Sequence, residues 1–121
     1  MMVTQFSTRQ IEPDITVVEI AGQLHAGNTL LSVESSLNKI LKEGPKKVVV
    51  DLSDLNLIDS SGIGILVVSS AQVKKLGGSF RLAGAVGSVA NVLATIGLNQ
   101  VIPMDPDVDT AARHLAEPQA Q

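Results

Sequence analysis

The run KVVVDL at residues 47–52 constrains the fold of this chain more than any other segment. A strand with one face in water alternates apolar and polar residues, whereas a continuous β-branched run is typical of a strand buried on both faces. A helix is predicted soon afterwards, over residues 60–76, and Gly77 and Gly78 would end it because glycine readily adopts the left-handed conformation. A buried strand followed by a helix predicts an α/β domain.

The remaining segments fit the same architecture. The turn signal Glu12-Pro13-Asp14 predicts that the first two strands form a hairpin. Other elements follow from periodicity and from helix start and stop signals, with Asp105 as a cap and Pro106 at the first helical position of the last helix. The predicted strands are residues 3–8, 15–21, 47–52, 79–83 and 101–102, and the predicted helices are residues 30–41, 60–76, 86–96 and 106–115.

These elements predict a single domain over residues 1–121, with a structured core from residue 3 to residue 115. The sheet would be mixed but mostly parallel, because each strand-helix-strand step makes neighbouring strands parallel. We expect four to five strands, an antiparallel strand pair at the N-terminus, and about four helices laid over the sheet.

The composition disfavours several classes of protein. Hydrophobic residues make up 45% of the chain and aromatic residues 2%, so the core must be aliphatic apart from Phe6 and Phe80. A net charge of -3 argues against a nucleic-acid partner, since phosphate binding needs a positive surface. Without cysteine there is no disulfide or thiolate metal site. The start has no signal-peptide pattern, and the longest apolar run, residues 63–68, is too short to span a membrane. We expect a cytoplasmic protein with no membrane partner, metal or cofactor.

The segment LIDSSGIG at residues 57–64 joins the central strand to the next helix. Loops at the carboxyl ends of strands carry the functional groups of open α/β sheets, and a helix start stabilises an added phosphate. Asp59 or Ser60 can cap the helix, which leaves the Ser61 hydroxyl pointing outward. Gly62 and Gly64 have no side chains that would project from this corner, so another protein could approach it closely. An ordinary helix cap followed by two glycines also accounts for the same residues.

The segment LIDSSGIGIL, preceded by KKVVVDLSDL and by IAGQL earlier in the chain, resembles the STAS family. These proteins are the anti-sigma factor antagonists of bacterial partner-switching systems. The later stretches KKLGGSFRLAG and VANVLATIGLNQVI are also similar to family members, so the resemblance extends from about residue 3 to residue 115. The D-S-S-G-[IL]-G pattern after a strand of this kind is fairly specific.

The resemblance implies a protein-binding switch and not an enzyme. The second serine of the pattern is the phosphoacceptor in this family, which implies Ser61 here, with Ser60 as the less favoured acceptor. The implied partner is an anti-sigma factor that is also a serine kinase. It binds the unphosphorylated antagonist, thereby releasing sigma factor, and phosphorylation abolishes this binding until a serine phosphatase resets the cycle. We expect a monomer or a weak homodimer.

A second segment is expected to belong to the same binding edge. Many family members carry an acidic residue where this chain has His25, directly after Gly22-Gln23-Leu24. An exposed loop histidine is the simpler interpretation, and the alternative hypothesis is that protonated His25 lies near Ser61 and pairs with its phosphate. His114 is interpreted as an ordinary surface residue. The expected partner-binding residues are His25, Ala26, Gly27, Asn28, Asp59, Ser60, Gly62, Ile63 and Gly64.

Other functions fit the sequence less well. A serine hydrolase would need G-x-S-x-G where residues 59–63 are DSSGI, and the phosphate-binding loops of nucleotide-dependent enzymes are absent. A receiver domain phosphorylated at Asp51 is a closer rival, but the first strand supplies no acidic pair for magnesium. The main alternative is a STAS scaffold or ligand-sensing module that is never phosphorylated.

Overall fold

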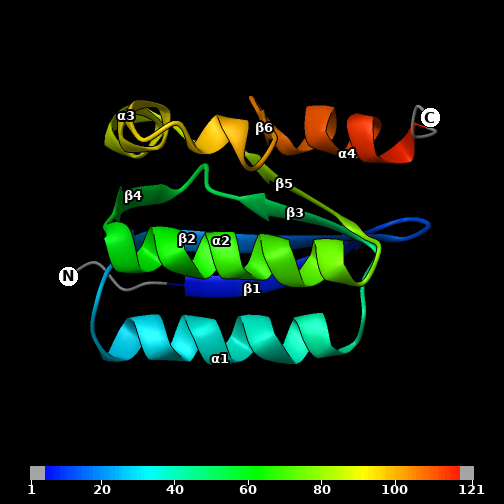
Figure 1. Cartoon of the computed structure of the whole chain (residues 1–121), viewed down its shortest axis with the longest axis horizontal. Coiled ribbons are helices and arrows are strands. Elements are labelled where there is room, and N and C mark those ends of the chain that lie inside the picture. Colours follow the sequence, from blue (N-terminus) through cyan, green and yellow to red (C-terminus); the bar gives the residue numbers. More distant parts are fainter. Residues whose placement is uncertain (1–4, 118–121) are drawn as a thin grey trace.

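The sheet of this protein has six strands and is covered by helices on both faces (Figure 1). The computed structural model describes residues 5–117, so residues 3 and 4 of the first predicted strand lie outside the described residues. The predicted fold class is confirmed. The elements are β1 (Gln5–Ile11), β2 (Ile15–Leu24), α1 (Asn28–Lys42), β3 (Lys47–Asp51), β4 (Leu55–Ile58), α2 (Ser60–Lys75), β5 (Ser79–Ala83), α3 (Gly87–Thr95), the 3-10 helix η1 (Leu98–Gln100), β6 (Met104–Asp105) and α4 (Val108–Ala116).

The ten-residue strand β2 organises the sheet. It pairs with β1 in the antiparallel direction and with β3 in the parallel direction, in the order β1-β2-β3-β5-β6. Val17 lies in the smaller apolar cluster, under α4, whereas Val18 and Ile20 lie in the larger cluster with α1 and α2. The first four residues of the strand are buried on both faces, whereas Glu19, Ala21 and Gln23 further along are half-buried.

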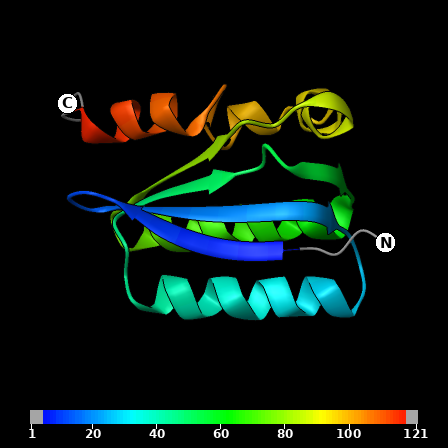
Figure 2. The same cartoon turned by 180° about the vertical axis from the view of Figure 1, so that it is seen from behind.

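Helices α1 and α2 lie side by side along one face of the sheet (Figures 1 and 2). Each buries one stripe of side chains at helical spacing, which on α1 consists of Val33, Leu37 and Leu41. On α2 the buried residues include Ile65, Leu66 and Val73. Both helices follow a strand and run back along the sheet, so their N-termini share one end of the molecule. None of the helices within residues 5–117 is long and apolar enough to span a membrane.

Strand β4 was not predicted, and the structure therefore has one more strand than the expected four to five. After β3 the chain turns and pairs again with β2, further along that strand, between Gly22 and Leu24. The Gly22 N–H donates to the Asp54 carbonyl at 3.0 Å, which fixes this second pairing. Two of the four residues of β4 are exposed, so the segment lacks a continuous apolar signal. Its effect is to carry the chain to the end of β2, where α2 begins.

The predictions for residues 101–106 were wrong. Val101 ends the 3-10 helix η1, and Ile102 is fully buried in the core without forming a strand. The last strand is Met104–Asp105, and helix α4 is capped by Asp107, which accepts the Thr110 N–H at 2.8 Å. The Asp105-Pro106 pattern therefore predicted the cap two residues too early. Pro106 precedes the cap and is not the first helical residue.

Asp105 instead forms the polar centre of this region. Its side chain is 3% exposed, and one carboxylate oxygen accepts from Arg81 Nε at 2.6 Å. His114 lies at the surface as predicted, yet its Nδ1 is 2.7 Å from the other oxygen. Burial raises the pKa of Asp105, but the hydrogen bonds from Arg81 and His114 outweigh it and hold the pKa below its ordinary value. The carboxylate therefore joins β5, β6 and α4 through its contacts with Arg81 and His114.

We expect Asp105→Asn to lower the free energy of unfolding by about 2 kcal/mol at neutral pH, because it leaves Arg81 without its counter-ion. A carboxyl with a lowered native pKa stabilises the fold above its unfolded pKa of about 4, and this contribution is lost as the pH falls through the native value. Urea titrations should therefore show a smaller difference from the wild type at about pH 3. Asp54→Asn is the control, and an equal loss at both pH values would contradict the assignment.

Candidate functional site

The site is built where the carboxyl ends of β2 and β4 lie next to each other. Leu24 pairs with Ile58 in the last register position, and the Asp59 N–H donates to the Leu24 carbonyl at 3.2 Å. Helix α1 begins shortly after β2 and α2 begins directly after β4, so two helix starts share this end of the molecule (Figure 1). The positive ends of two helix dipoles therefore face the same region.

Asp59 fastens the two segments together. One carboxylate oxygen accepts the Gly62 N–H at 3.0 Å, which confirms aspartate as the cap of α2. The other oxygen accepts the Ala26 N–H at 3.0 Å, from the loop that leads into α1. The structure thus brings together the two segments that were singled out in the sequence.

The same contacts set the charge of this carboxyl. Hydrogen bonds from the N–H groups of Ala26 and Gly62, with smaller effects from Ser61 and the charge of His25, hold the pKa of Asp59 below its ordinary value. A slight desolvation acts in the opposite direction. Asp59 is consequently ionised at neutral pH.

Ser60 and Ser61 are the first two residues of α2, and both are exposed. Gly64 is also exposed, whereas Ile63 is half-buried and packs against the main core. Val67, one turn further along the helix, is 36% exposed. The outer surface of this helix start therefore carries two hydroxyl groups with an apolar strip beside them.

Gly62 has a role inside the chain that the sequence did not reveal. A Cβ atom there would lie 2.5 Å from the Leu24 carbonyl oxygen and 2.9 Å from Ile58 Cγ1. The missing side chain lets α2 start directly against the end of β2, which is a different reason from the predicted access for a partner. At Gly64 nothing lies within 4 Å of such an atom. Only the second glycine leaves open space on the outer surface.

The two glycines give a matched pair of substitutions. We expect Gly62→Ala to lower the free energy of unfolding by on the order of 2 kcal/mol, because backbone must move to admit the methyl group. Gly64→Ala should leave it unchanged or raise it by up to about 1 kcal/mol, since alanine is the better helix former. Chemical denaturation of both variants measures the difference. Equal stabilities would mean that the contact with Leu24 does not constrain the helix start.

The loop before α1 presents the other predicted residues. His25, Ala26, Gly27 and Asn28 are all exposed, and His25 Nδ1 lies 3.1 Å from the Ala26 carbonyl oxygen. Gly27 precedes the first helical residue with a φ of 141°, a conformation that favours glycine. His25 therefore directly precedes Ala26, whose N–H is bound by the cap residue of α2.

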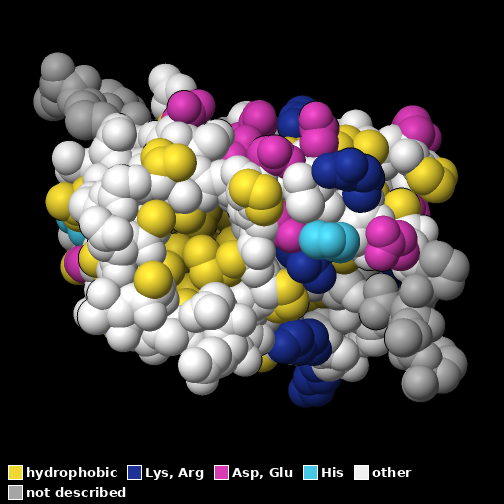
Figure 3. Space-filling view, turned by 90° about the horizontal axis from the view of Figure 1, so that it is seen from above, with side chains coloured by type: hydrophobic (Ala, Val, Ile, Leu, Met, Phe, Trp, Pro, Cys, Tyr) yellow, Lys and Arg dark blue, Asp and Glu magenta, His cyan; other side chains and the backbone are white. Residues whose placement is uncertain are grey.

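Two exposed apolar residues near this end were missed in the sequence. Leu57 on β4 is 42% exposed, and Val86, directly before α3, is 58% exposed. Ser88 Oγ donates to the Asn56 carbonyl at 3.1 Å, which holds the start of α3 against β4. On the face that Figure 3 shows, hydrophobic side chains gather in a hollow on the half where α3 lies, and charged ones gather on the half where α4 lies. In the sequence, an apolar residue in a short strand is expected to lie in the core. The exposure of Leu57 becomes evident only from the pairing of β4 in the structure.

Asp51, the candidate phosphoacceptor of the rival receiver interpretation, closes a turn. Its Oδ1 accepts the Ser53 N–H at 3.0 Å, directly after β3. Within residues 5–117, no three acidic or histidine side chains lie close enough to hold a metal ion. The geometry around Asp51 therefore offers no support for that interpretation beyond its place after a buried strand.

This mixed sheet, with the capped D-S-S-G helix start at its carboxyl end, defines a recognised class of small domain. The STAS domain model matches residues 7–111, and the chain therefore belongs to the STAS domain family. The predicted family is confirmed.

Several proteins that this chain is similar to are described as anti-sigma factor antagonists. A candidate anti-sigma factor antagonist of Thermotoga neapolitana is 27% identical over 112 residues, which is 93% of this chain and 96% of that protein. The crystal structure of an anti-sigma factor antagonist from Mycobacterium paratuberculosis superposes with a TM-score of 0.84 at 19% identity, over 95% of this chain and 96% of that one. Unphosphorylated SpoIIAA, an anti-sigma factor antagonist, gives 0.78 at 16% identity over 96% and 100% of the chains. The phosphorylated form of the Bacillus SpoIIAA gives 0.70 at 17% identity over 91% and 98%. At these identities the superpositions establish the fold.

Proposed function

We propose that this protein is an anti-sigma factor antagonist whose binding is switched by phosphorylation of Ser61. The observation that carries the proposal is the exposure of Ser61 in the first turn of α2, beside the start of α1. A kinase can reach a hydroxyl group in this position without unfolding the chain. The unphosphorylated protein would bind an anti-sigma factor that is also a serine kinase, releasing sigma factor, and a serine phosphatase would restore it.

The surroundings of Ser61 favour a change in docking over a change in fold. The backbone on either side is held by Asp59, which accepts from Gly62 and from Ala26 at 3.0 Å each. A phosphate on the hydroxyl would gain from the positive end of the helix dipole, which favours its tolerance by the domain. The modification thus acts on the surface that a partner would meet.

The surface around the serine supports the proposal that a phosphate weakens binding. The half-buried Ile63 and the exposed Val67 lie on the same helix, and Leu57 and Val86 are exposed nearby on β4 and before α3. We expect a partner that docks on the apolar residues of this helix start to lie beside the serine. Burying about -1.5 to -2 charges without a counter-ion at this interface would cost about 3 kcal/mol, which corresponds to a roughly hundredfold loss of affinity.

The experiment is to incubate the protein with a cognate anti-sigma kinase and ATP, and to measure intact mass and partner affinity. We expect the gain of one phosphate, mapped to the peptide that contains Ser61 and lost in Ser61→Ala but retained in the matched control Ser60→Ala. Phosphorylation or Ser61→Glu should weaken binding roughly a hundredfold. Unmodified protein that binds partners equally well would instead support the alternative of a STAS scaffold or ligand-sensing module.

His25 supplies a separate test of the geometry around the phosphate. If the imidazolium pairs with the phosphoserine dianion, it lowers the second pKa of the phosphate, which is about 6 in an unperturbed phosphoserine. His25→Ala should therefore raise that pKa in a ³¹P NMR titration of the phosphorylated protein. Asn28→Ala in the same loop is the control, because it removes no charge. An unchanged phosphate titration in His25→Ala would remove His25 from the switch.

A further inference from the structure

The distribution of charge points to a second surface, far from Ser61. All six lysines of the chain lie at one end of the molecule, where α1 and α2 finish and where β3 and β5 begin. The last turns of the two helices supply four of them, and the other two lie directly before β3 and at its first residue. They are Lys39, Lys42, Lys46, Lys47, Lys74 and Lys75.

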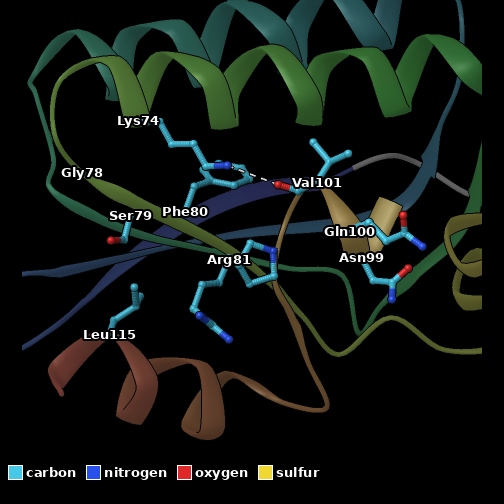
Figure 4. Close-up of a pocket in the computed structure, with 10 residues that line it drawn as sticks. Lys74, Gly78, Ser79, Phe80, Arg81, Asn99, Gln100, Val101 and Leu115 are labelled. Atoms are coloured by element: carbon cyan, nitrogen blue, oxygen red, sulfur yellow. Dashed lines mark hydrogen bonds between the residues drawn. The ribbon is translucent and has the colours of Figure 1, made fainter. Parts of the chain in front are cut away.

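The cavity drawn in Figure 4 lies at the same end of the molecule, but the cations that line it already have partners within the chain. Lys74 Nζ donates to the Val101 carbonyl at 3.2 Å, shown as the dashed line. Arg81 is held by the buried carboxylate of Asp105. The two cations that line this cavity of about 270 Å³ therefore have partners within the chain.

A larger groove lies between the ends of α1 and α2. Its volume is about 490 Å³, and its walls expose more apolar than polar surface. Leu41 contributes to the lining, and Leu76, just after α2, is 52% exposed. The lining residues are Asn38, Leu41, Lys42, Gln72, Lys75 and Leu76.

The lysines of this groove have no acidic counterparts in the described part of the chain. Over residues 5–117 the only lysine within ion-pair distance of a carboxylate is Lys47, whose Nζ lies 3.2 Å from Asp14. Lys46 is tied to the Leu76 carbonyl at 2.7 Å, which fixes the end of the groove. The helix dipoles explain why lysines are favourable near the C-termini of α1 and α2. They do not account for an exposed leucine between Lys42 and Lys75.

We propose that this lysine-flanked groove, defined by the six lining residues above, binds an acidic amphipathic helix of a partner protein. Two parallel helices with a furrow between them accept a third helix, whose leucine-type side chains would cover the exposed Leu76 and pack over the buried Leu41 at the floor of the furrow. Carboxylates on its flanks would pair with Lys42 and Lys75. A concave furrow fits a helix, whereas a membrane surface needs a flat or convex apolar face.

The groove and the serine lie at opposite ends of α2. Helical rise over the fourteen residues from Ser61 to Lys75 separates them by about 21 Å. A partner in the groove therefore leaves the serine surface open, and the second interaction does not depend on phosphorylation. It goes beyond the proposed switch and stands without it.

The probe is a fluorescein-labelled synthetic helix with leucines at i, i+3, i+4 and i+7 and glutamates on both flanks, titrated with the full chain by fluorescence anisotropy. Binding should weaken at least tenfold in Lys42→Glu and in Lys75→Glu. Lys74→Glu is the matched control, because it makes the same charge change one residue away on another face. The affinity should be the same in Ser61→Glu, and a peptide with scrambled leucines should not bind.

Three results would overturn the proposal. Equal losses in Lys74→Glu and Lys75→Glu would mean non-specific attraction to the basic end. No binding up to about 1 mM peptide would mean that the furrow accepts no helix. Sedimentation with anionic lipid vesicles, in the absence of peptide binding, would identify a membrane as the occupant. A failure of the Ser61 switch would leave the peptide result unaffected, so the two proposals are tested separately.

Discussion

The pairing of one strand with three others determines the rest of this structure. β2 uses its first half to pair with β3 and its last residues to pair with β4, while β1 covers its other edge. Because β4 ends beside the last residue of β2, the chain can begin α2 against that strand. Gly62 then permits the approach and Asp59 closes it with two hydrogen bonds. Without the second pairing, the loop before α1 and the start of α2 would have no common edge.

This construction separates the rigid part of the site from its variable part. The backbone of the helix start is fixed by a buried glycine, a strand end and an ionised carboxylate, and none of these groups needs to change when a partner binds. The hydroxyl groups of Ser60 and Ser61 project from that frame and are exposed. A chemical change on such a hydroxyl alters charge at the surface without loosening the core, which is the property that a reversible binding switch requires.

The sequence predicted those parts of the fold that depend on local patterns. The valine run of β3, the strand Ser79–Ala83 and the cap at Asp59 were all visible, because burial on both faces and helix capping leave clear local signals. β4 and β6 were not, since their pairing depends on residues far along the chain. The contact of Gly62 with Leu24 is also long-range, so the glycine was visible while its reason was not. His114 could not be linked to Asp105 before the path of the last strand was known.

The direction of the helices also explains why the molecule has two chemically different ends. In strand-helix-strand units both α1 and α2 start at the carboxyl edge of the sheet and finish at its amino edge. Capping aspartates therefore collect at one edge, where Asp59 lies, and lysines that suit helix C-termini collect at the other. The same topology that exposes Ser61 at one helix start leaves lysines around the furrow between two helix ends. One helix, α2, connects the two surfaces, and its buried stripe of Ile65, Leu66 and Val73 keeps them at a fixed distance.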